Sequence, residues 1–266
     1  MSKRPKQRLD KLLVERGFAE TRAKAQAMIL AGQVLVNEQK AEKPGQSFDS
    51  ASQLRIKGEP SRYVSRGGLK LEAALARFNV DPSGKTCIDI GASTGGFTDC
   101  LLQHGAKQVW AVDVGHNQLA WRIRQDPRVE VIEGMNARDL DQKRFPVKFE
   151  LATIDVSFIS LAKILPSVRQ VLSDSGEVVA LIKPQFEVGK GEVGRGGIVS
   201  DPAKQKRVIQ EVVEGAVAFG LWATGVTESP IRGGGGNREF FVHLVRTPQD
   251  SSTAQIELHI SELLSR

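Results

Sequence analysis

The pattern of apolar and polar positions changes after Gly84, where short apolar runs begin to alternate with stretches of helical periodicity. The apolar runs predict strands at 86–90, 108–113, 129–133, 151–156, 178–183 and 240–245. Strands that alternate with helices are typical of a doubly wound sheet with helices on both faces. The last run is expected to pair antiparallel near an edge. This part of the chain therefore predicts an α/β domain.

Residues 1–60 follow a different pattern. Apolar residues recur at helical spacing within 9–13 and again within 25–29. Gly17 is a candidate C-cap for the first helix, and Thr21 can cap the second. Two short apolar runs then indicate small strands, at 34–36 and 54–56. Two short helices followed by small strands predict one compact module.

The two patterns are joined by a stretch in which flexible glycines precede a helical pattern, Ser65-Arg66-Gly67-Gly68-Leu69-Lys70-Leu71. A chain of 266 residues is long enough for one large and one small domain. We expect a small domain at 1–60, a linker at 61–67 and a large domain at 68–266. The linker would be a hinge that leads into the first helix of the large domain.

Charge is distributed unevenly along the chain. Residues 1–66 hold 14 Lys and Arg against 7 Asp and Glu, whereas the remaining 200 residues hold 23 against 24. A positive excess concentrated in this way favours a polyanion as partner, RNA or DNA first. A merely solvated basic face is the alternative. Arg8, Lys11, Arg22 and Lys24 fall on or beside the two predicted helices, where they could meet phosphates as a group.

Several classes of protein are disfavoured by the sequence. It contains no run of eighteen apolar residues and no apolar stretch of a secretory signal at its start, so we expect a cytoplasmic protein without a membrane partner. Cys87 and Cys100 are expected to be packed thiols rather than a disulfide. The four histidines show no spacing of metal ligands, so no metal is expected.

The segment 87–99 joins a short apolar strand, through small residues, to a helical pattern. Gly91, Gly95 and Gly96 allow a tight turn and a close approach of the backbone to a ligand. The next strand ends in Asp113, about twenty residues after the first glycine, where a ribose-binding acid is expected. The glycines do not fit G-x-G-x-x-G, which disfavours a dinucleotide. The turn resembles the S-adenosylmethionine site of Rossmann-like methyltransferases, and an ordinary tight turn is the alternative.

Four ionisable residues are expected near the carboxyl ends of the strands, where open α/β sheets place their active sites. Asp155 and Lys183 end predicted strands, Glu239 precedes the last strand, and Lys70 arrives from the helix before the first strand. A lysine at the end of an apolar strand is costly to bury unless it is paired, and Asp155 and Glu239 could supply that pairing. A purely structural cluster of ion pairs is the alternative.

The N-terminal module resembles an S4 RNA-binding domain over roughly residues 7–60. The resemblance rests on three motifs, Arg8-Leu9-Asp10-Lys11-Leu12-Leu13, Thr21-Arg22-Ala23-Lys24-Ala25 and Gly32-Gln33-Val34-Leu35-Val36-Asn37. S4 domains recognise folded RNA through a positive surface on this helix pair. The resemblance therefore implies RNA contacts, for which the expected residues are Arg8, Lys11, Arg22, Lys24 and, in the linker, Arg66.

The four ionisable residues together resemble the Lys-Asp-Lys-Glu tetrad of FtsJ-type ribose 2′-O-methyltransferases. An S4 domain followed by an FtsJ-like domain resembles the TlyA family, some members of which are labelled haemolysins. The supporting motifs are those at 65–71, 91–99, 155–160 and 183–187. The resemblance implies a Rossmann-like, S-adenosylmethionine-dependent methyltransferase that acts on ribose 2′-hydroxyls of ribosomal RNA, with the S4 domain docking folded rRNA or a ribosomal subunit.

The resemblance also assigns site residues. Those expected to bind the cofactor are Asp89, Gly91, Ser93, Gly95, Gly96, Phe97, Asp113, Asn136 and Ala137. Asp113 would bind its ribose, Asn136 and Ala137 would lie at its adenine, and Lys70, Asp155, Lys183 and Glu239 would be catalytic. Lys183 would present or deprotonate the 2′-hydroxyl. A second cation at Lys70 favours a neutral Lys183, and the two carboxylates oppose it, so the sequence leaves base and orienting roles open.

Three other functions compete with this interpretation. The segment 155–158 is faintly similar to the box of amino-group methyltransferases, but it lacks both prolines of that box. A ribosome-assembly factor with an idle methyltransferase fold is the second alternative, and retention of the tetrad and Asp113 argues against it. A pore-forming haemolysin is the third, and the absence of a membrane span disfavours it. The glycine-rich stretches 189–197 and 233–236 are either mobile substrate-side loops or ordinary surface loops.

Overall fold

The computed structural model describes residues 6–19, 21–57, 62–189, 191–248 and 253–264. Its chain divides into two compact units, Met1–Pro60 and Ser61–Arg266. Each unit has a hydrophobic core of its own, with one cluster of buried residues in the first and two in the second. The two units are described separately.

The small unit contains the two helices and the small strands that the sequence predicts. Helices α1 (Leu9–Glu15) and α2 (Arg22–Leu30) precede a three-stranded sheet in the order β3-β2-β5. The Thr21 hydroxyl caps α2, because it accepts a hydrogen bond from the Lys24 amide at 3.2 Å. The bounds of the strands are β1 Lys6–Arg8, β2 Val34–Val36, β3 Gln39–Lys40, β4 Ser47–Asp49 and β5 Leu54–Ile56. Leu9, Leu13 and Ile29 are fully buried between the helices and this sheet.

The large unit is built on a seven-stranded sheet in the order β11-β12-β10-β9-β6-β7-β8. Strands β10, β9, β6, β7 and β8 are parallel, and β12 pairs antiparallel with β10 and β11. Their bounds are β6 Thr86–Ile90, β7 Gln108–Asp113, β8 Val129–Glu133, β9 Phe149–Ile154, β10 Leu172–Ile182, β11 Trp222–Glu228 and β12 Phe240–Val245. The predicted α/β class and the antiparallel last strand are confirmed.

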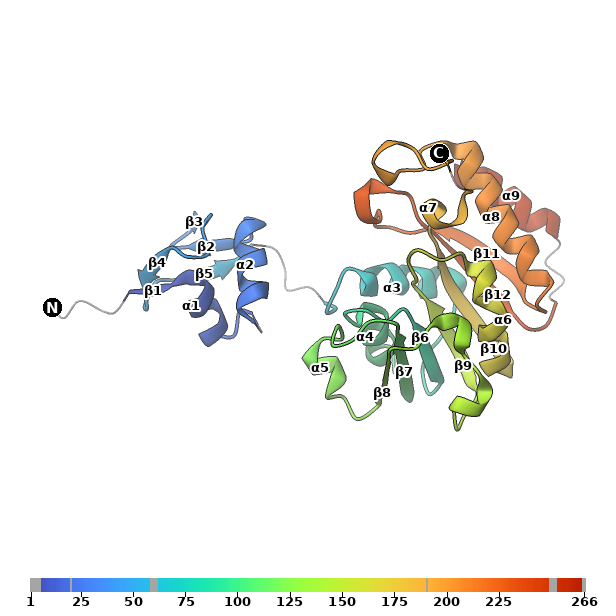
Figure 1. The fold of residues 1–266 in the computed structure, drawn as a ribbon, viewed down its shortest axis with the longest axis horizontal. Coiled ribbons are helices and arrows are strands. Elements are labelled where there is room, and N and C mark those ends of the chain that lie inside the picture. Colours follow the sequence, from blue (N-terminus) through green and yellow to red (C-terminus); the bar gives the residue numbers. More distant parts are fainter. Residues whose placement is uncertain (1–5, 20, 58–61, 190, 249–252, 265–266) are drawn as a thin grey trace. The chain divides into compact units, whose positions relative to one another are not determined.

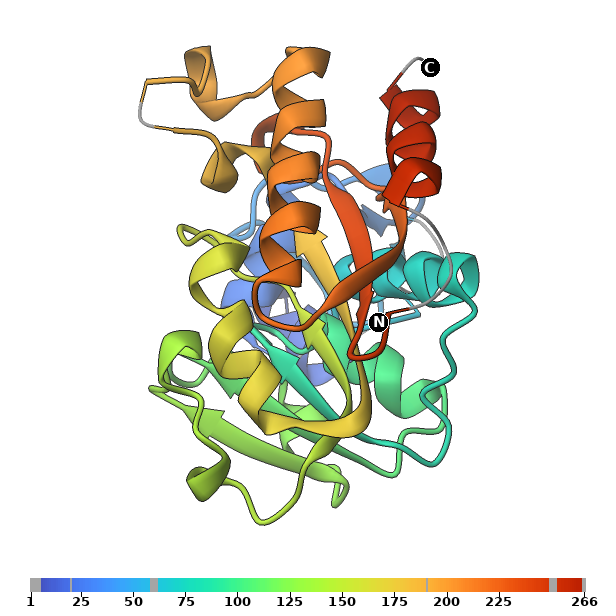
Figure 2. The ribbon, with the colours of Figure 1, turned by 90° about the vertical axis from the view of Figure 1, so that its right-hand side faces the viewer.

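Helices cover both faces of the sheet (Figure 1). One face is covered by α3 (Gly67–Phe78), α4 (Gly96–Gln103) and α5 (Trp121–Arg124), the other by α6 (Leu165–Val171), α8 (Pro202–Val217) and α9 (Thr253–Leu264). Figure 2 shows α6, α8 and α9 in front of the sheet. The remaining helices are short: α7 Pro184–Glu187, η1 Ala137–Asp139, η2 Gln142–Arg144, η3 Leu161–Lys163, η4 Arg195–Gly197 and η5 Gly234–Gly236. The apolar sides of both layers bury the central strands, whereas the edge strands β8 and β11 stay partly exposed.

The segment expected to be a linker lies in the second unit. Position 61 is outside the described residues, but Tyr63 is buried, and the Val64 amide donates a hydrogen bond to the Asp99 carboxylate at 2.8 Å. The Tyr63 ring lies against Gly68 at the start of α3, where an added Cβ would be only 2.2 Å from the ring. The glycine therefore serves a close packing contact between this segment and the first helix.

Candidate active site

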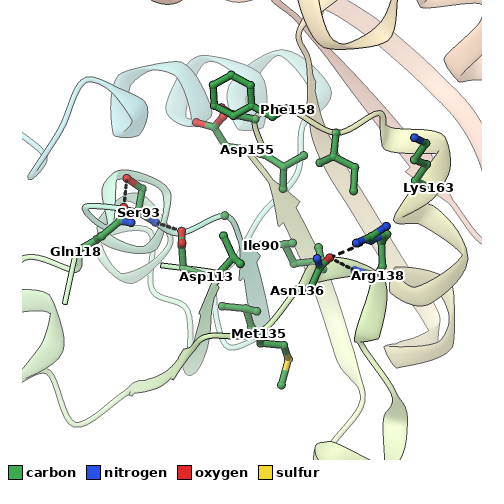
Figure 3. Close-up of a pocket in the computed structure, with 17 residues that line it drawn as sticks. Ile90, Ser93, Asp113, Gln118, Met135, Asn136, Arg138, Asp155, Phe158 and Lys163 are labelled. Atoms are coloured by element: carbon green, nitrogen blue, oxygen red, sulfur yellow. Dashed lines mark hydrogen bonds between the residues drawn. The ribbon is translucent and has the colours of Figure 1, made fainter. Parts of the chain in front are cut away.

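A cavity of about 550 Å³ opens at the carboxyl ends of β6, β7 and β9. Open α/β sheets bind ligands at this position. Figure 3 shows Ser93, Gln118 and Asp113 on one side of the cavity and Asn136 and Arg138 on the other. The residues that line it are Ile90, Gly91, Ser93, Val112, Asp113, Val114, Gln118, Met135, Asn136, Ala137, Arg138, Asp155, Val156, Ser157, Phe158, Ile159 and Lys163. Five of the expected cofactor residues are among them.

Gly91 lies where the turn after β6 meets the end of β9. Its φ of +84° is in the left-handed region, and an added Cβ would lie 2.4 Å from the Asp155 carbonyl oxygen. The Asp155 amide also donates a hydrogen bond to the Ile90 carbonyl at 2.9 Å. A side chain at position 91 would therefore both strain the turn and push the two strand ends apart. The absence of a side chain at position 91 lets the ends of β6 and β9 lie close together in this wall of the cavity.

The Asp113 carboxylate is held in a fixed orientation by two backbone amides. Its Oδ2 accepts a hydrogen bond from the Ser93 amide at 2.8 Å, and its Oδ1 accepts one from the Gly115 amide at 2.7 Å. The Ser93 hydroxyl in turn donates to the Gln118 side-chain oxygen at 3.3 Å. An orientated carboxylate with lone pairs left over can accept hydrogen bonds from a pair of vicinal hydroxyls.

The opposite side of the cavity is formed by the segment that follows β8. The Asn136 side-chain oxygen accepts a hydrogen bond from the Arg138 amide at 3.0 Å, which starts η1 and fixes the segment. Met135, Ala137 and Val112 add apolar surface. A flat, mostly apolar ring with polar edges fits such a wall.

Four expected cofactor residues do not line the cavity. Asp89 is fully buried inside the sheet, where its carboxylate accepts hydrogen bonds from the Thr98 hydroxyl at 2.6 Å and the Thr153 hydroxyl at 3.1 Å. Burial raises the pKa of Asp89 to about 7, since it disfavours the charged form. Gly95 is the N-cap of α4, Gly96 abuts Ser65, and the Phe97 ring packs 6.1 Å from that of Phe241.

The four tetrad residues form two ion pairs. Lys183 Nζ lies 2.6 Å from Asp155 Oδ1 and also donates to the Ser157 hydroxyl at 3.1 Å. Lys70 Nζ lies 2.6 Å from Glu239 Oε2. The lysine side chains are 13% and 12% exposed and Glu239 is 2% exposed, so these charges meet little solvent. Breaking either pair would leave a largely buried charge without its partner.

Strand register brings the two pairs to one edge of the sheet. Ile182 at the end of β10 is directly opposite Phe240 at the start of β12, so the next residues outward are Lys183 and Glu239. Asp155 follows directly after β9, which is the parallel neighbour of β10. Lys70 belongs to α3 and reaches this edge through Glu239. Of the four side chains only Asp155 lines the cavity, and the other three lie at the same edge of the sheet.

Sequence reasoning did not assign Gln118, Arg138, Phe158 and Lys163 to the site, although all four line the cavity. Phe158 stands out because its side chain is 89% exposed and its φ is +65°, a conformation that bulky residues rarely adopt. Its ring lies 4.8 Å from that of Phe186. The signal in the sequence is an aromatic residue three positions after the strand-end carboxylate Asp155.

In the small unit, two of the expected RNA-binding residues share one buried carboxylate. Asp10 is fully buried and accepts hydrogen bonds from Arg8 at 2.9 and 3.1 Å, from Arg22 at 3.0 Å and from the Gln26 amide group at 2.9 Å. The Arg8 guanidinium, with help from Gln26 and Arg22, holds the pKa of Asp10 well below its usual range. Both arginine side chains remain about half exposed. Lys11, Lys24 and, in the large unit, Arg66 are exposed as well.

Comparisons with known families fit this architecture. The FtsJ-like methyltransferase model matches residues 63–246, and the S4 domain model matches residues 7–50. The fold and the site therefore define a methyltransferase of the FtsJ-like class that carries an S4 domain.

Individual relatives place the chain more narrowly. It is 44% identical to the 16S/23S rRNA (cytidine-2′-O)-methyltransferase TlyA of Mycobacterium tuberculosis, over 91% of each chain. It is 54% identical to a Bacillus subtilis protein provisionally named rRNA methyltransferase YqxC, over 90% of this chain and 85% of that one. A solved Streptococcus thermophilus protein with a provisional hemolysin label is 47% identical, with a TM-score of 0.76 over 98% of this chain and 96% of that one. The chain belongs to the TlyA family.

Two further observations concern the described part of the chain. None of its helices is long and apolar enough to cross a membrane. Nor do the same residues contain a group of three or more His, Cys, Asp or Glu side chains arranged to hold a metal ion.

Proposed function

We propose that this protein transfers a methyl group from S-adenosylmethionine to a ribose 2′-hydroxyl of ribosomal RNA. The observation that carries the proposal is the juxtaposition of the Lys183–Asp155 and Lys70–Glu239 ion pairs beside a cavity that holds an orientated Asp113. The names of the relatives support the same chemistry, since the Mycobacterium tuberculosis protein is named for cytidine-2′-O methylation.

The residues of the cavity fit S-adenosylmethionine, which supplies an activated methyl group on its sulfonium sulfur. Asp113 would accept hydrogen bonds from both ribose hydroxyls, because two amides fix its orientation. Asn136 and Ala137 would line the adenine, and Gly91 and Ser93 would lie toward the methionine end. The missing Cβ at Gly91 lets the ends of β6 and β9 come close together beside the cavity. Asp89, Gly95, Gly96 and Phe97 would support this wall from behind.

Lys183 is proposed to hold and orient the 2′-hydroxyl. Its contacts with Asp155 at 2.6 Å and the Ser157 hydroxyl at 3.1 Å fix the position of the Nζ that would meet this hydroxyl. Bound S-adenosylmethionine would supply the methyl group, and Lys183 would keep the hydroxyl oxygen in line with it while the hydroxyl proton passes to solvent. Lys70 and Glu239 would fix the other side of the ribose. Orientation of this kind accounts for much of the rate in well-aligned displacements.

Binding of RNA is proposed to involve both units. Arg8 and Arg22 keep a defined orientation on Asp10 while remaining half exposed, which suits contacts to the phosphates of a folded RNA. Lys11, Lys24 and Arg66 would add further phosphate contacts. At the cavity, the exposed ring of Phe158 offers a surface on which a base can stack. The small domain at 1–60 is thus proposed to dock the RNA, and the large domain to modify it.

The test is transfer of a labelled methyl group to ribosomal subunits that lack the modification, followed by mass spectrometry of the nucleosides. Lys183→Ala should abolish formation of a 2′-O-methylnucleoside. Lys107→Ala is the matched control, because this exposed lysine precedes β7 at the opposite end of the sheet. A methyl group on the base would instead indicate amino-group chemistry. No transfer to either subunit by a protein that binds S-adenosylhomocysteine would favour an assembly role without catalysis.

A further inference from the structure

The short helix α7 directly follows Lys183 and is attached to the loop at 155–161, which lines the cavity. Side chains of three residues, Lys183, Phe186 and Glu187, join the two segments. Lys183 pairs with Asp155 and bonds to Ser157, the Phe186 ring lies 4.8 Å from the Phe158 ring, and the Glu187 carboxylate accepts a hydrogen bond from the Leu161 amide at 2.9 Å. The segment at 183–187, which begins with the tetrad lysine, therefore contacts the loop from its start to its end.

Glu187 is the last of these contacts and has no role in the proposed chemistry. Its carboxylate also interacts with the Ser160 hydroxyl, and burial raises its pKa. Glu187 forms no ion pair with another described residue, so its partners are the backbone and hydroxyl groups at the end of the loop. A carboxylate that is largely desolvated and bonded to a backbone amide fixes that amide firmly.

The loop that Glu187 holds is strained. Phe158 has a φ of +65°, and its side chain is 89% exposed, so burial of the ring does not explain the conformation. Such conformations persist only where the surrounding contacts determine them. The loop is fixed at its start by the hydrogen bond from the Asp155 amide to Ile90 and at its end by the bond from the Leu161 amide to Glu187. Release of the second contact would allow the loop to relax.

We propose that Glu187 is a positioning residue for the methyl-transfer step. It holds the cavity-facing loop at 155–161 so that the target nucleoside meets Lys183 in the correct orientation. The inference rests on the proposed function, because the loop is assigned to the substrate step. The loop lines the same cavity as Asp113, Asn136 and Ala137, but those three belong to or follow β7 and β8, so cofactor affinity should depend on Glu187 much less than kcat does.

The experiment compares Glu187→Ala with Glu187→Gln. The alanine variant should lower kcat for ribosomal RNA by about tenfold or more, the scale expected when reacting groups lose alignment. Its affinity for S-adenosylhomocysteine should stay within about twofold of the wild type, which is a smaller change than the loss of a single hydrogen bond causes. The glutamine variant keeps an oxygen that can accept from the Leu161 amide, so it should recover most of kcat. Glu211→Ala is the matched control. The negative charge of Glu211 acts on the Glu187 carboxylate, but its own ion pair is with Arg207 and not with the loop.

Hydrogen exchange of the peptide at 157–163 gives a readout that does not depend on activity. Glu187→Ala should speed exchange of the Leu161 amide, and Glu187→Gln should not. An alanine variant with wild-type kcat, or a glutamine variant as impaired as alanine, would overturn the proposal. So would equal losses of kcat and cofactor affinity, which would indicate a general structural role. If the wild type itself transfers no methyl group while the exchange pattern holds, the proposed function fails and the loop contact stands.

Discussion

Lys70→Met should destabilise the large unit strongly, because it removes the ion-pair partner of Glu239. That carboxylate is 2% exposed and Lys70 is 12% exposed, so water cannot replace the lost contact of 2.6 Å. Removal of one partner from a buried ion pair costs about 3 to 5 kcal/mol. For a unit of this size, each kcal/mol lowers the melting temperature by about 2 to 4 °C. The expected decrease is therefore about 6 to 20 °C.

The double variant Lys70→Met/Glu239→Leu separates stability from catalysis. Replacement of a buried ion pair by apolar side chains of similar size is often neutral or stabilising, so the second substitution should restore much of the lost stability. Methyl transfer should stay absent in both variants, because the tetrad is incomplete. Recovery of activity along with stability would instead support the alternative that this pair is only structural.

Urea unfolding followed by tryptophan fluorescence is the suitable assay. All three tryptophans, Trp110, Trp121 and Trp222, belong to the large unit, so the signal reports that unit alone. Lys107→Met is the control, since an exposed lysine away from such contacts should change stability by no more than about 0.5 kcal/mol. A Lys70→Met variant that loses less than about 1 kcal/mol would refute the reasoning, because that value is typical of a solvent-exposed pair.

Three further predictions concern other carboxylates. Asp113→Ala should weaken S-adenosylhomocysteine binding by about tenfold or more, as judged by calorimetry, since charge-assisted hydrogen bonds to the ribose are lost; unchanged affinity would remove Asp113 from the cofactor site. Burial raises the pKa of Asp89 from its ordinary value of 3.8 to about 7, so the folded state binds the additional proton, and this contribution to stability is lost as the pH rises through about 7. Asp89→Asn should flatten that dependence in urea unfolding at about pH 5 and 7.5, and an unaltered slope would show that another group causes it. Asp10→Ala should weaken binding of an rRNA fragment in anisotropy titrations while the salt dependence persists, because Arg8 and Arg22 keep their charge but lose their orientation; equal or tighter binding would contradict a need for fixed arginines.

Strands β6, β7, β8 and β12 have the bounds that the apolar runs predict. Of these, β6 and β12 are buried along almost their whole length, where the interior of the sheet excludes polar side chains, whereas the edge strand β8 is only partly buried. The strand β11 was missed. It lies at an edge, contains Gly225 and Glu228, and is only half buried along most of its length, so it has no continuous apolar run. Edge strands are specified by their partner as much as by their own residues.

The candidate site was predictable only in part, for a geometric reason. Residues at the end of a strand, such as Asp113, or just beyond it, such as Gly91 and Asp155, reach the cavity. Asp89 lies two residues earlier, within β6, where its side chain is fully buried against Thr98 of α4 and Thr153 of β9. Likeness of motifs alone does not distinguish these positions. The register that sets Lys183 opposite Glu239 depends on pairing between distant strands, which local sequence does not contain.

Charge counting had a similar limit in the small unit. It treats Arg8 and Arg22 as part of a positive surface, whereas the structure gives both arginines the same buried partner, Asp10. The net charge is unaltered by that contact, but the guanidinium groups lose freedom before any RNA binds. Preorganisation of this kind lowers the entropic cost of recognition rather than adding attraction. Composition therefore predicts the class of partner, and only the structure shows how the contact groups are held.

The two sides of the site share one wall, at the turn after β6. Gly91 contributes to the cavity where the cofactor is proposed to bind, and its missing Cβ leaves room for the Asp155 carbonyl, whose side chain in turn pairs with Lys183. From Lys183 the chain continues into α7, which fixes the loop of Phe158 through Glu187. Because each of these contacts begins near a strand end, the sheet register would position the proposed methyl donor, the lysine and the loop at 155–161 together. A shift in one of these contacts would displace the others, so a site of this kind gains from rigid strand ends.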